Sequence, residues 1–201
     1  MAFSDLWILN PLKLPVGVGW SLAEAQGPHP PARGGHSATV LGDRLYIFGG
    51  NTTQVGFNDL WFLDLPVKEE TGARWQQVPT VANFPPARIG HSAMALGDRI
   101  IIYGGRDLVT GRYMWSPSCF DARSQAFAAF STPAFAAADT TQELEGGGMW
   151  SSWKSTGHST VLCEEGLITF GGLMPSGPTQ LGGVHNVTWL LDVVGAGDHH
   201  V

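Results

Sequence analysis

Cysteine and charge are both scarce in this sequence. Its only two cysteines, Cys119 and Cys163, have no second cysteine or histidine at zinc-ligand spacing, which excludes a disulfide framework and leaves both as small buried hydrophobic side chains. Charged residues make up 14% of the chain, and acidic residues outnumber basic ones to give a net charge of −6. A basic surface for the phosphates of nucleic acids is therefore not expected.

Long apolar stretches are missing too. No segment approaches the ~20 apolar residues that span a bilayer, and the opening Met-Ala-Phe-Ser-Asp lacks the basic and hydrophobic regions of a signal peptide. We therefore expect a cytoplasmic protein without a membrane segment. Helical periodicity of any length is absent as well. The chain has instead 27 glycines, 13 prolines and 8 tryptophans around short aromatic and β-branched runs, which is typical of many short strands joined by tight turns.

The feature that decides the fold is an internal repeat. Residues 31–50, PARGGHSATVLGDRLYIFGG, return 55 residues later as residues 86–105, PARIGHSAMALGDRIIIYGG. A looser third copy covers residues 157–172. In each copy the histidine precedes the first glycine of a Gly-Gly pair by 13 residues, a regularity that chance would rarely produce. The repeated unit is therefore structural.

Each complete unit predicts four strands. The first two cover residues 36–41 and 45–48 and are joined by Gly42-Asp43, a pair suited to a tight hairpin. A third strand follows at 59–65 and a fourth at 74–78. The second strand is apolar at successive positions, which fits a strand covered on both faces. Four-stranded antiparallel sheets repeated around an axis are the blades of a β-propeller.

These residues resemble the kelch repeat, which is marked by a double glycine after an apolar strand and by an aromatic residue and a tryptophan downstream. The resemblance covers roughly residues 1–130 and 157–192. It implies a β-propeller, commonly of six or seven blades, that binds other proteins. The third unit departs from the pattern because Phe127 stands where a fourth-strand tryptophan like Trp75 is expected.

The predicted fold is all-β, a single kelch-type β-propeller domain whose ring of four-stranded antiparallel blades is incomplete. We expect four parts: the end of a first blade (1–28), a second blade (29–80), a third blade (81–156) and a last partial blade (157–201). The third part includes an inserted loop at 131–156. Together these parts supply 13 predicted strands. An open blade face forfeits on the order of 10 kcal/mol of apolar burial, comparable with the ~5–15 kcal/mol that stabilises a whole domain.

Something must therefore cover the terminal blades. The cover could come from the rest of a longer propeller, from another polypeptide, or from closure into a four-bladed ring. Closure into a four-bladed ring is disfavoured, because the first and last partial units would both supply the third strand of the shared blade. We favour remaining propeller blades or a protein partner, so that the chain is part of a longer chain or of a complex.

Three histidines occupy the same place in the three repeats and invite a metal hypothesis. They are His36, His91 and His158. A residue that recurs with the fold usually packs or hydrogen-bonds for the fold, so we predict no metal and no other cofactor. The Gly-Gly pairs lack the Gly-Lys-Ser/Thr of a phosphate-binding loop, and backbone geometry explains them better.

The loops remain, because function usually resides where the fold leaves residue choice free. Arginines and aromatic residues are the usual anchors of protein interfaces. Those predicted to bind a partner are Arg33, Arg88, Arg106, Arg112, Tyr113, Trp150 and Trp153. For the repeated Arg33 and Arg88 a structural role is an equal alternative, in which they bind backbone carbonyls or carboxylates such as Asp64 and Asp121.

The leading hypothesis is a protein-interaction or assembly module that presents its propeller loops to a partner. One alternative is an enzyme or metal-binding lyase of the kelch-propeller type with a site on the ring axis. It is less favoured because the sequence has neither a Gly-x-Ser-x-Gly elbow nor a pair of carboxylates set apart from the repeat. A second alternative is a reader of small ligands or glycans, which would use an exposed Trp150 or Trp153.

Overall fold

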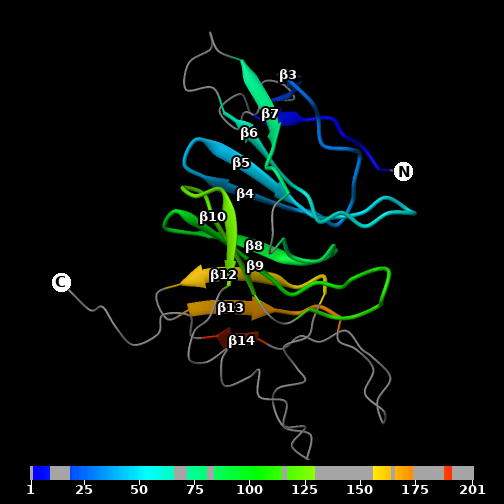
Figure 1. Cartoon of the computed structure of the whole chain (residues 1–201), viewed down its shortest axis with the longest axis vertical. Helices are drawn as coiled ribbons and strands as arrows, with labels where there is room; N and C mark the ends of the chain where they lie inside the picture. Colours follow the sequence, from blue (N-terminus) through cyan, green and yellow to red (C-terminus); the bar gives the residue numbers. More distant parts are fainter. Residues whose placement is uncertain are drawn as a thin grey trace, which may run out of the picture.

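The computed structural model describes residues 2–9, 19–65, 72–80, 84–114, 117–129, 156–163, 166–173 and 188–191. All regular elements in these residues are β-strands, arranged in four sheets that follow one another in chain order (Figure 1). The described strands form an arc and do not close into a ring. Within the same residues there is no helix long and apolar enough to span a bilayer. The predicted all-β fold of four-stranded and partial blades is confirmed.

Two sheets are complete four-stranded antiparallel blades. The second blade consists of β4 (Ser37–Leu41), β5 (Arg44–Phe48), β6 (Leu60–Asp64) and β7 (Ala73–Gln77). The third blade consists of β8 (Ser92–Leu96), β9 (Arg99–Tyr103), β10 (Ser118–Asp121) and β11 (Ala126–Ala129). Leu41 pairs with Arg44, so Gly42-Asp43 forms the predicted two-residue turn.

The two ends of the arc are partial blades. At the N-terminal end β1 (Trp7–Leu9) pairs only with β2 (Trp20–Leu22) among the described strands, and at the C-terminal end β12 (Ser159–Cys163), β13 (Gly166–Phe170) and β14 (Thr188–Leu191) form a three-stranded sheet. One strand was not predicted. The two-residue β3 (Ala25–Gln26) pairs in parallel with β7 and adds a fifth strand to the outer edge of the second blade.

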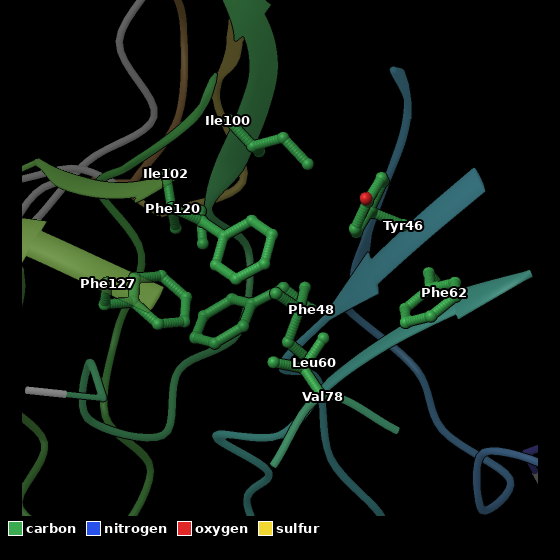
Figure 2. Close-up of a cluster of buried hydrophobic side chains, with 9 residues drawn as sticks. All are labelled: Tyr46, Phe48, Leu60, Phe62, Val78, Ile100, Ile102, Phe120 and Phe127. Atoms are coloured by element: carbon green, nitrogen blue, oxygen red, sulfur yellow. The ribbon is translucent and has the colours of Figure 1, made fainter. Parts of the chain in front are cut away.

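The largest core cluster lies between the second and third blades. Aromatic and aliphatic side chains from the two facing sheets interlock there (Figure 2), and they are Tyr46, Phe48, Leu60, Phe62 and Val78 from one blade and Ile100, Ile102, Phe120 and Phe127 from the other. Phe127 pairs with Phe120 as Trp75 pairs with Leu63 in the preceding blade. Phe127 therefore occupies the fourth-strand tryptophan position, as the repeat predicts.

A smaller cluster joins the third and last blades. Met94, Ile101, Tyr103 and Cys119 pack there against Leu167 of β13. Cys119 is buried as expected, and this burial raises the pKa of its thiol. Cys163 is only half-buried, because it lies at the end of β12 beside the turn to β13. Each pair of neighbouring blades is thus held by its own apolar layer.

The residue before each Gly-Gly pair packs on the histidine of the following blade. The ring centroids of Phe48 and His91 lie 5.3 Å apart in an edge-on arrangement, and those of Tyr103 and His158 lie 5.6 Å apart in the same arrangement. In the last blade the equivalent Phe170 is 54% exposed. At the other end His36 is exposed, whereas the other two histidines are buried. Both ends of the arc therefore present blade faces without a described neighbour, as the strand count predicts.

Candidate functional site

The loops that follow the Gly-Gly pairs project to the same side of the arc (Figure 1). Backbone bridges place these loops, since the residue after each Gly-Gly pair pairs with the segment that leads into the first strand, as in Gly34 with Asn51 and Ile89 with Arg106. The lead-in segments are joined between blades, because the amide of Gly90 donates to the carbonyl of Gly35 over 3.0 Å. We call residues 51–57 and 106–113, together with Leu173, the loop surface.

Close packing at this edge requires glycine. Gly50 has a φ of 89°, and a Cβ placed on it would lie 2.7 Å from the carbonyl oxygen of Gly34. That separation is well below a normal van der Waals contact, and the positive φ is itself unfavourable for other residues. The predicted role of the Gly-Gly pairs in backbone geometry, rather than in phosphate binding, agrees with these contacts.

The loop at 106–113 carries three of the residues that the sequence nominated for partner binding. Arg106 and Arg112 are exposed, and the Arg106 guanidinium lies 5.7 Å from the ring centroid of the half-buried Tyr113. The loop tip is apolar, because Leu108 is exposed and Val109 is 86% exposed. The structure thus brings two arginines, an aromatic ring and two aliphatic side chains together on one projecting loop.

Hydrogen bonds within the loop fix this arrangement. The Asp107 carboxylate accepts a 2.8 Å bond from the Thr110 hydroxyl and another of 2.8 Å from the Val109 amide. The hydroxyl bond, which is the largest cause, and the backbone bonds hold the pKa of Asp107 below its usual value. At the base of the loop the amide of Asp107 donates to the carbonyl of Arg112. The loop therefore has a defined shape before any partner binds.

The neighbouring loop at 51–57 is uncharged. The hydroxyl of Thr52 accepts hydrogen bonds from the amides of Gln54 and Val55, and the amide of Thr52 donates to the carbonyl of Val55. The Val55 side chain is exposed, as is that of Leu173 in the last blade. Each of the three blades therefore contributes an exposed aliphatic side chain to the loop surface.

Three ion pairs lie on the opposite edge of the described blades. The arginines near the hairpin turns form ion pairs, namely Arg44 with Asp64, Arg99 with Asp121, and Arg123 with Asp98. Arg106 and Arg112 have no carboxylate within ion-pair distance among the described residues. The loop surface therefore presents two exposed arginines without an ion pair in the described part of the chain, Arg106 and Arg112, beside the exposed Leu108 and Val109.

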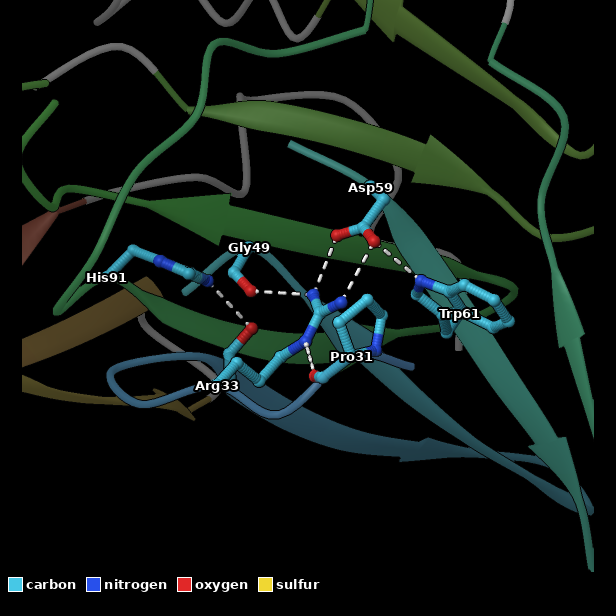
Figure 3. Close-up of polar contacts among 7 residues, drawn as sticks. Pro31, Arg33, Gly49, Asp59, Trp61 and His91 are labelled. Carbon is cyan, nitrogen blue, oxygen red and sulfur yellow. Dashed lines mark hydrogen bonds and ion pairs between the residues drawn. The ribbon is translucent and has the colours of Figure 1, made fainter. Parts of the chain in front are cut away.

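Arg33 is structural. Its guanidinium is buried, donates to both oxygens of Asp59 over 2.6 and 2.9 Å, and donates to the carbonyl of Gly49 over 2.9 Å (Figure 3). Asp59 also accepts a 2.6 Å bond from the indole N–H of Trp61. The structural alternative was thus correct in kind, but the carboxylate is Asp59 of the same blade rather than Asp64 or Asp121.

Arg88 is buried in the equivalent place of the third blade. It donates to the carbonyls of Gly104 and Pro86 over 3.2 and 3.4 Å, as Arg33 does to those of Gly49 and Pro31. No carboxylate among the described residues pairs with it, and burial lowers its pKa to about 10. Being buried, neither Arg33 nor Arg88 is available to a partner at the surface.

The repeated histidines contribute to packing. His91 Nε2 lies 2.9 Å from the Ser37 hydroxyl of the preceding blade, and burial lowers the pKa of His91 to about 3. In the part of the chain that the structure describes, no three His, Cys, Asp or Glu side chains lie close enough together to hold a metal ion. His91 and His158 therefore each join their blade to the preceding one.

Two nominated residues, Trp150 and Trp153, lie outside the described residues, as does most of the inserted loop at 131–156. The sequence analysis did not identify Asp59 as the carboxylate that binds Arg33. A usable signal was present, because Asp-Leu-Trp occurs at residues 5–7 and again at 59–61. In both copies the tryptophan indole donates a 2.6 Å hydrogen bond to the aspartate two residues earlier.

Comparison with known proteins agrees with the fold. A family model described as the KLHDC2/KLHL20/DRC7 Kelch-repeats domain matches residues 1–136. The chain is 36% identical over 104 residues to Tip elongation aberrant protein 1 of Schizosaccharomyces pombe, covering 52% of this chain and 9% of that protein. It is 37% identical over 87 residues to Kelch domain-containing protein 3 of Bos taurus, covering 43% of this chain and 22% of that protein.

A third relative is the flagellar outer arm dynein alpha chain of Chlamydomonas reinhardtii, 42% identical over 95 residues, or 45% of this chain and 2% of that protein. The matches thus span less than a quarter of the length of these relatives. Since the family model covers more than half of the chain and includes all strands from β1 to β11, the chain belongs to the kelch-repeat family.

Proposed function

We propose that this kelch domain is a protein-interaction module whose loop surface holds a partner protein. The observation that carries the proposal is the combination of exposed aliphatic side chains with arginines that have no carboxylate among the described residues. Arginine is enriched at the centres of protein interfaces, where apolar neighbours exclude water around it. Kelch domains typically bind proteins, and this loop surface fits that role.

The charges indicate the chemistry of the partner. Arg106 and Arg112 flank the exposed Leu108 and Val109 at the tip of one loop. A partner segment that places carboxylates beside an apolar side chain would pair with both features, because arginine binds carboxylates with two parallel hydrogen bonds. The module therefore selects an acidic segment with an apolar anchor. A cytoplasmic location remains our prediction.

The test is recovery of a partner by the purified chain, followed by substitution of the loop surface. A double variant, Arg106→Glu with Arg112→Glu, should lose the recovered partner, and Val109→Glu should weaken its binding. Arg123→Glu is the matched control, because Arg123 is exposed on the opposite edge. An equal loss of partner binding in the control variant, or partner binding that is unchanged in the loop variants, would count against this surface. Stoichiometric iron or copper in the purified protein would favour the enzyme alternative instead.

A further inference from the structure

Arg88 is a buried cation whose hydrogen bonds are few and long. The residue is 3% exposed, and its guanidinium donates to the carbonyls of Gly104 and Pro86 over 3.2 and 3.4 Å. Neither bond uses Nη2, and among the described residues no atom accepts a hydrogen bond from that nitrogen. Burial lowers the pKa of Arg88 to about 10, which still leaves the side chain charged at neutral pH. A buried charge is costly unless an opposite charge pairs with it.

The second blade shows what this arginine position can hold. There Nη1 and Nη2 of Arg33 each donate to one oxygen of the Asp59 carboxylate, and the indole of Trp61 donates to the same carboxylate (Figure 3). The Asp59 side chain is 15% exposed, so the place that it fills can be reached from the solvent. The arrangement is thus an anion site in which a guanidinium and one further donor converge.

Strand register identifies the equivalent positions in the third blade. Trp61 and Ser118 each pair with the residue two before the Gly-Gly pair of their own blade. Ser118 therefore takes the place of Trp61, and Ser116, two residues earlier, takes that of Asp59. Hydrogen bonds give the same alignment, because the amide two residues before each of the latter positions donates to the second glycine of the pair. Ser116 lies outside the described residues, so its place is known from this count along the sequence.

These two replacements change the size and the charge of the site. An aspartate and a tryptophan are both replaced by serine, which removes the carboxylate and reduces the side-chain volume at both positions. The half-buried Ser118 still offers a donor, its hydroxyl, where Trp61 has the indole N–H. A phosphate group suits this combination, because it is larger than a carboxylate and accepts paired hydrogen bonds from a guanidinium. Serine is also a residue that can carry a phosphate covalently.

We propose that Arg88 anchors a phosphate site in the third blade, where the phosphate takes the place that the Asp59 carboxylate has in the second blade. The phosphate is either free phosphate from solution or a phosphoserine at residue 116, and both present the same oxygens to the guanidinium. In the second case a protein kinase transfers the γ-phosphoryl group of ATP to the Ser116 hydroxyl oxygen, with release of ADP and of the hydroxyl proton. The proposal does not depend on the function proposed for the loop surface.

Thermal melting of the full chain tests the site. Ser116→Asp supplies a tethered carboxylate, so this variant should melt at a higher temperature than the unmodified chain. Ser21→Asp, at an exposed serine on β2, is the matched control and should not. If the phosphate comes from solution, sodium phosphate should raise the melting temperature above that in sodium chloride of equal ionic strength. The rise should be about 3 °C at a phosphate concentration tenfold above the dissociation constant, and it should be absent in Arg88→Met and in Ser116→Asp.

A chain with phosphoserine incorporated at residue 116 tests the second source. It should melt at a higher temperature than the unmodified chain, and Arg88→Met should remove the gain. By ³¹P NMR, the second pKa of the phosphoserine should lie below its usual value of about 6 and return to it in Arg88→Met. Stabilisation by either source that requires Arg88 supports the proposal and identifies the source. Stabilisation by neither source, or stabilisation that persists in Arg88→Met, would overturn it. So would a Ser116→Asp chain no more stable than Ser21→Asp, a comparison that needs no Arg88 variant to fold.

Discussion

Replacing Asp59 with asparagine isolates the charge of the buried ion pair with Arg33. Asparagine keeps the shape of the side chain and one acceptor oxygen, but it removes the negative charge and one of the two oxygens that Arg33 and Trp61 share. The guanidinium of Arg33 would remain where it is, because the carbonyls of Gly49 and Pro31 still hold it.

The expected cost follows from burial. The Arg33 side chain is 3% exposed and that of Asp59 is 15% exposed, so the substitution leaves a buried cation without its counter-charge. Removing one partner of a buried pair costs ~3–5 kcal/mol, and because asparagine retains one acceptor we expect about 3 kcal/mol. That is a large part of the ~5–15 kcal/mol that stabilises a typical domain.

The matched control is Asp64→Asn, on the same strand β6. Asp64 pairs with Arg44 at the surface, where the two side chains are 37% and 32% exposed, and such pairs contribute less than about 1 kcal/mol. Urea denaturation of both variants, followed by circular dichroism, gives the two free energies of unfolding. If Asp59→Asn costs no more than Asp64→Asn, the account of Arg33 as a buried structural cation is wrong.

Three further outcomes are expected. Desolvation by burial lowers the pKa of His91 from 6.5 to about 3. Between these values the unfolded chain binds a proton that the folded chain does not, so the urea midpoint should fall as the pH falls below about 6.5. The midpoint of the control variant His91→Asn should fall less. Phe48→Ala should cost ~3–5 kcal/mol of unfolding free energy, whereas Phe170→Ala, at an exposed equivalent position, should change it by about 0.5 kcal/mol or less. Gly50→Ala should lower the melting temperature more than Gly42→Ala, because both have positive φ but only the Gly50 Cβ would meet backbone within 4 Å.

Most of the blade architecture could be predicted because it repeats. The spacing from histidine to Gly-Gly and the Gly42-Asp43 turn are local signals, and they identify the first two strands of each blade with their register. Phe127 could be placed as a substitute for tryptophan because hydrophobic volume at that position serves the same packing. Periodicity and turn chemistry are visible along the chain, and here they agree with the tertiary structure.

Features that depend on contacts between distant segments were not predicted. β3 is two residues long, and its parallel pairing with β7 depends on where the link between blades passes. The carboxylate that binds Arg33 lies 26 residues away in the chain. Because Asp59 and Asp64 are both aspartates on the same segment, the sequence alone does not show which of them binds Arg33. Of the nominated partner-binding residues that the structure describes, exposure separates Arg106 and Arg112 from the buried Arg33 and Arg88.

The separate apolar layers between blades also determine how the arc comes apart. In the described structure the third blade is covered on both faces, whereas the sheets at the two ends are covered on one. Local opening therefore begins at the ends and reaches β8 and β9 last, so amide protons there exchange with solvent most slowly. A substitution that unfolds a terminal sheet should therefore leave the second and third blades folded.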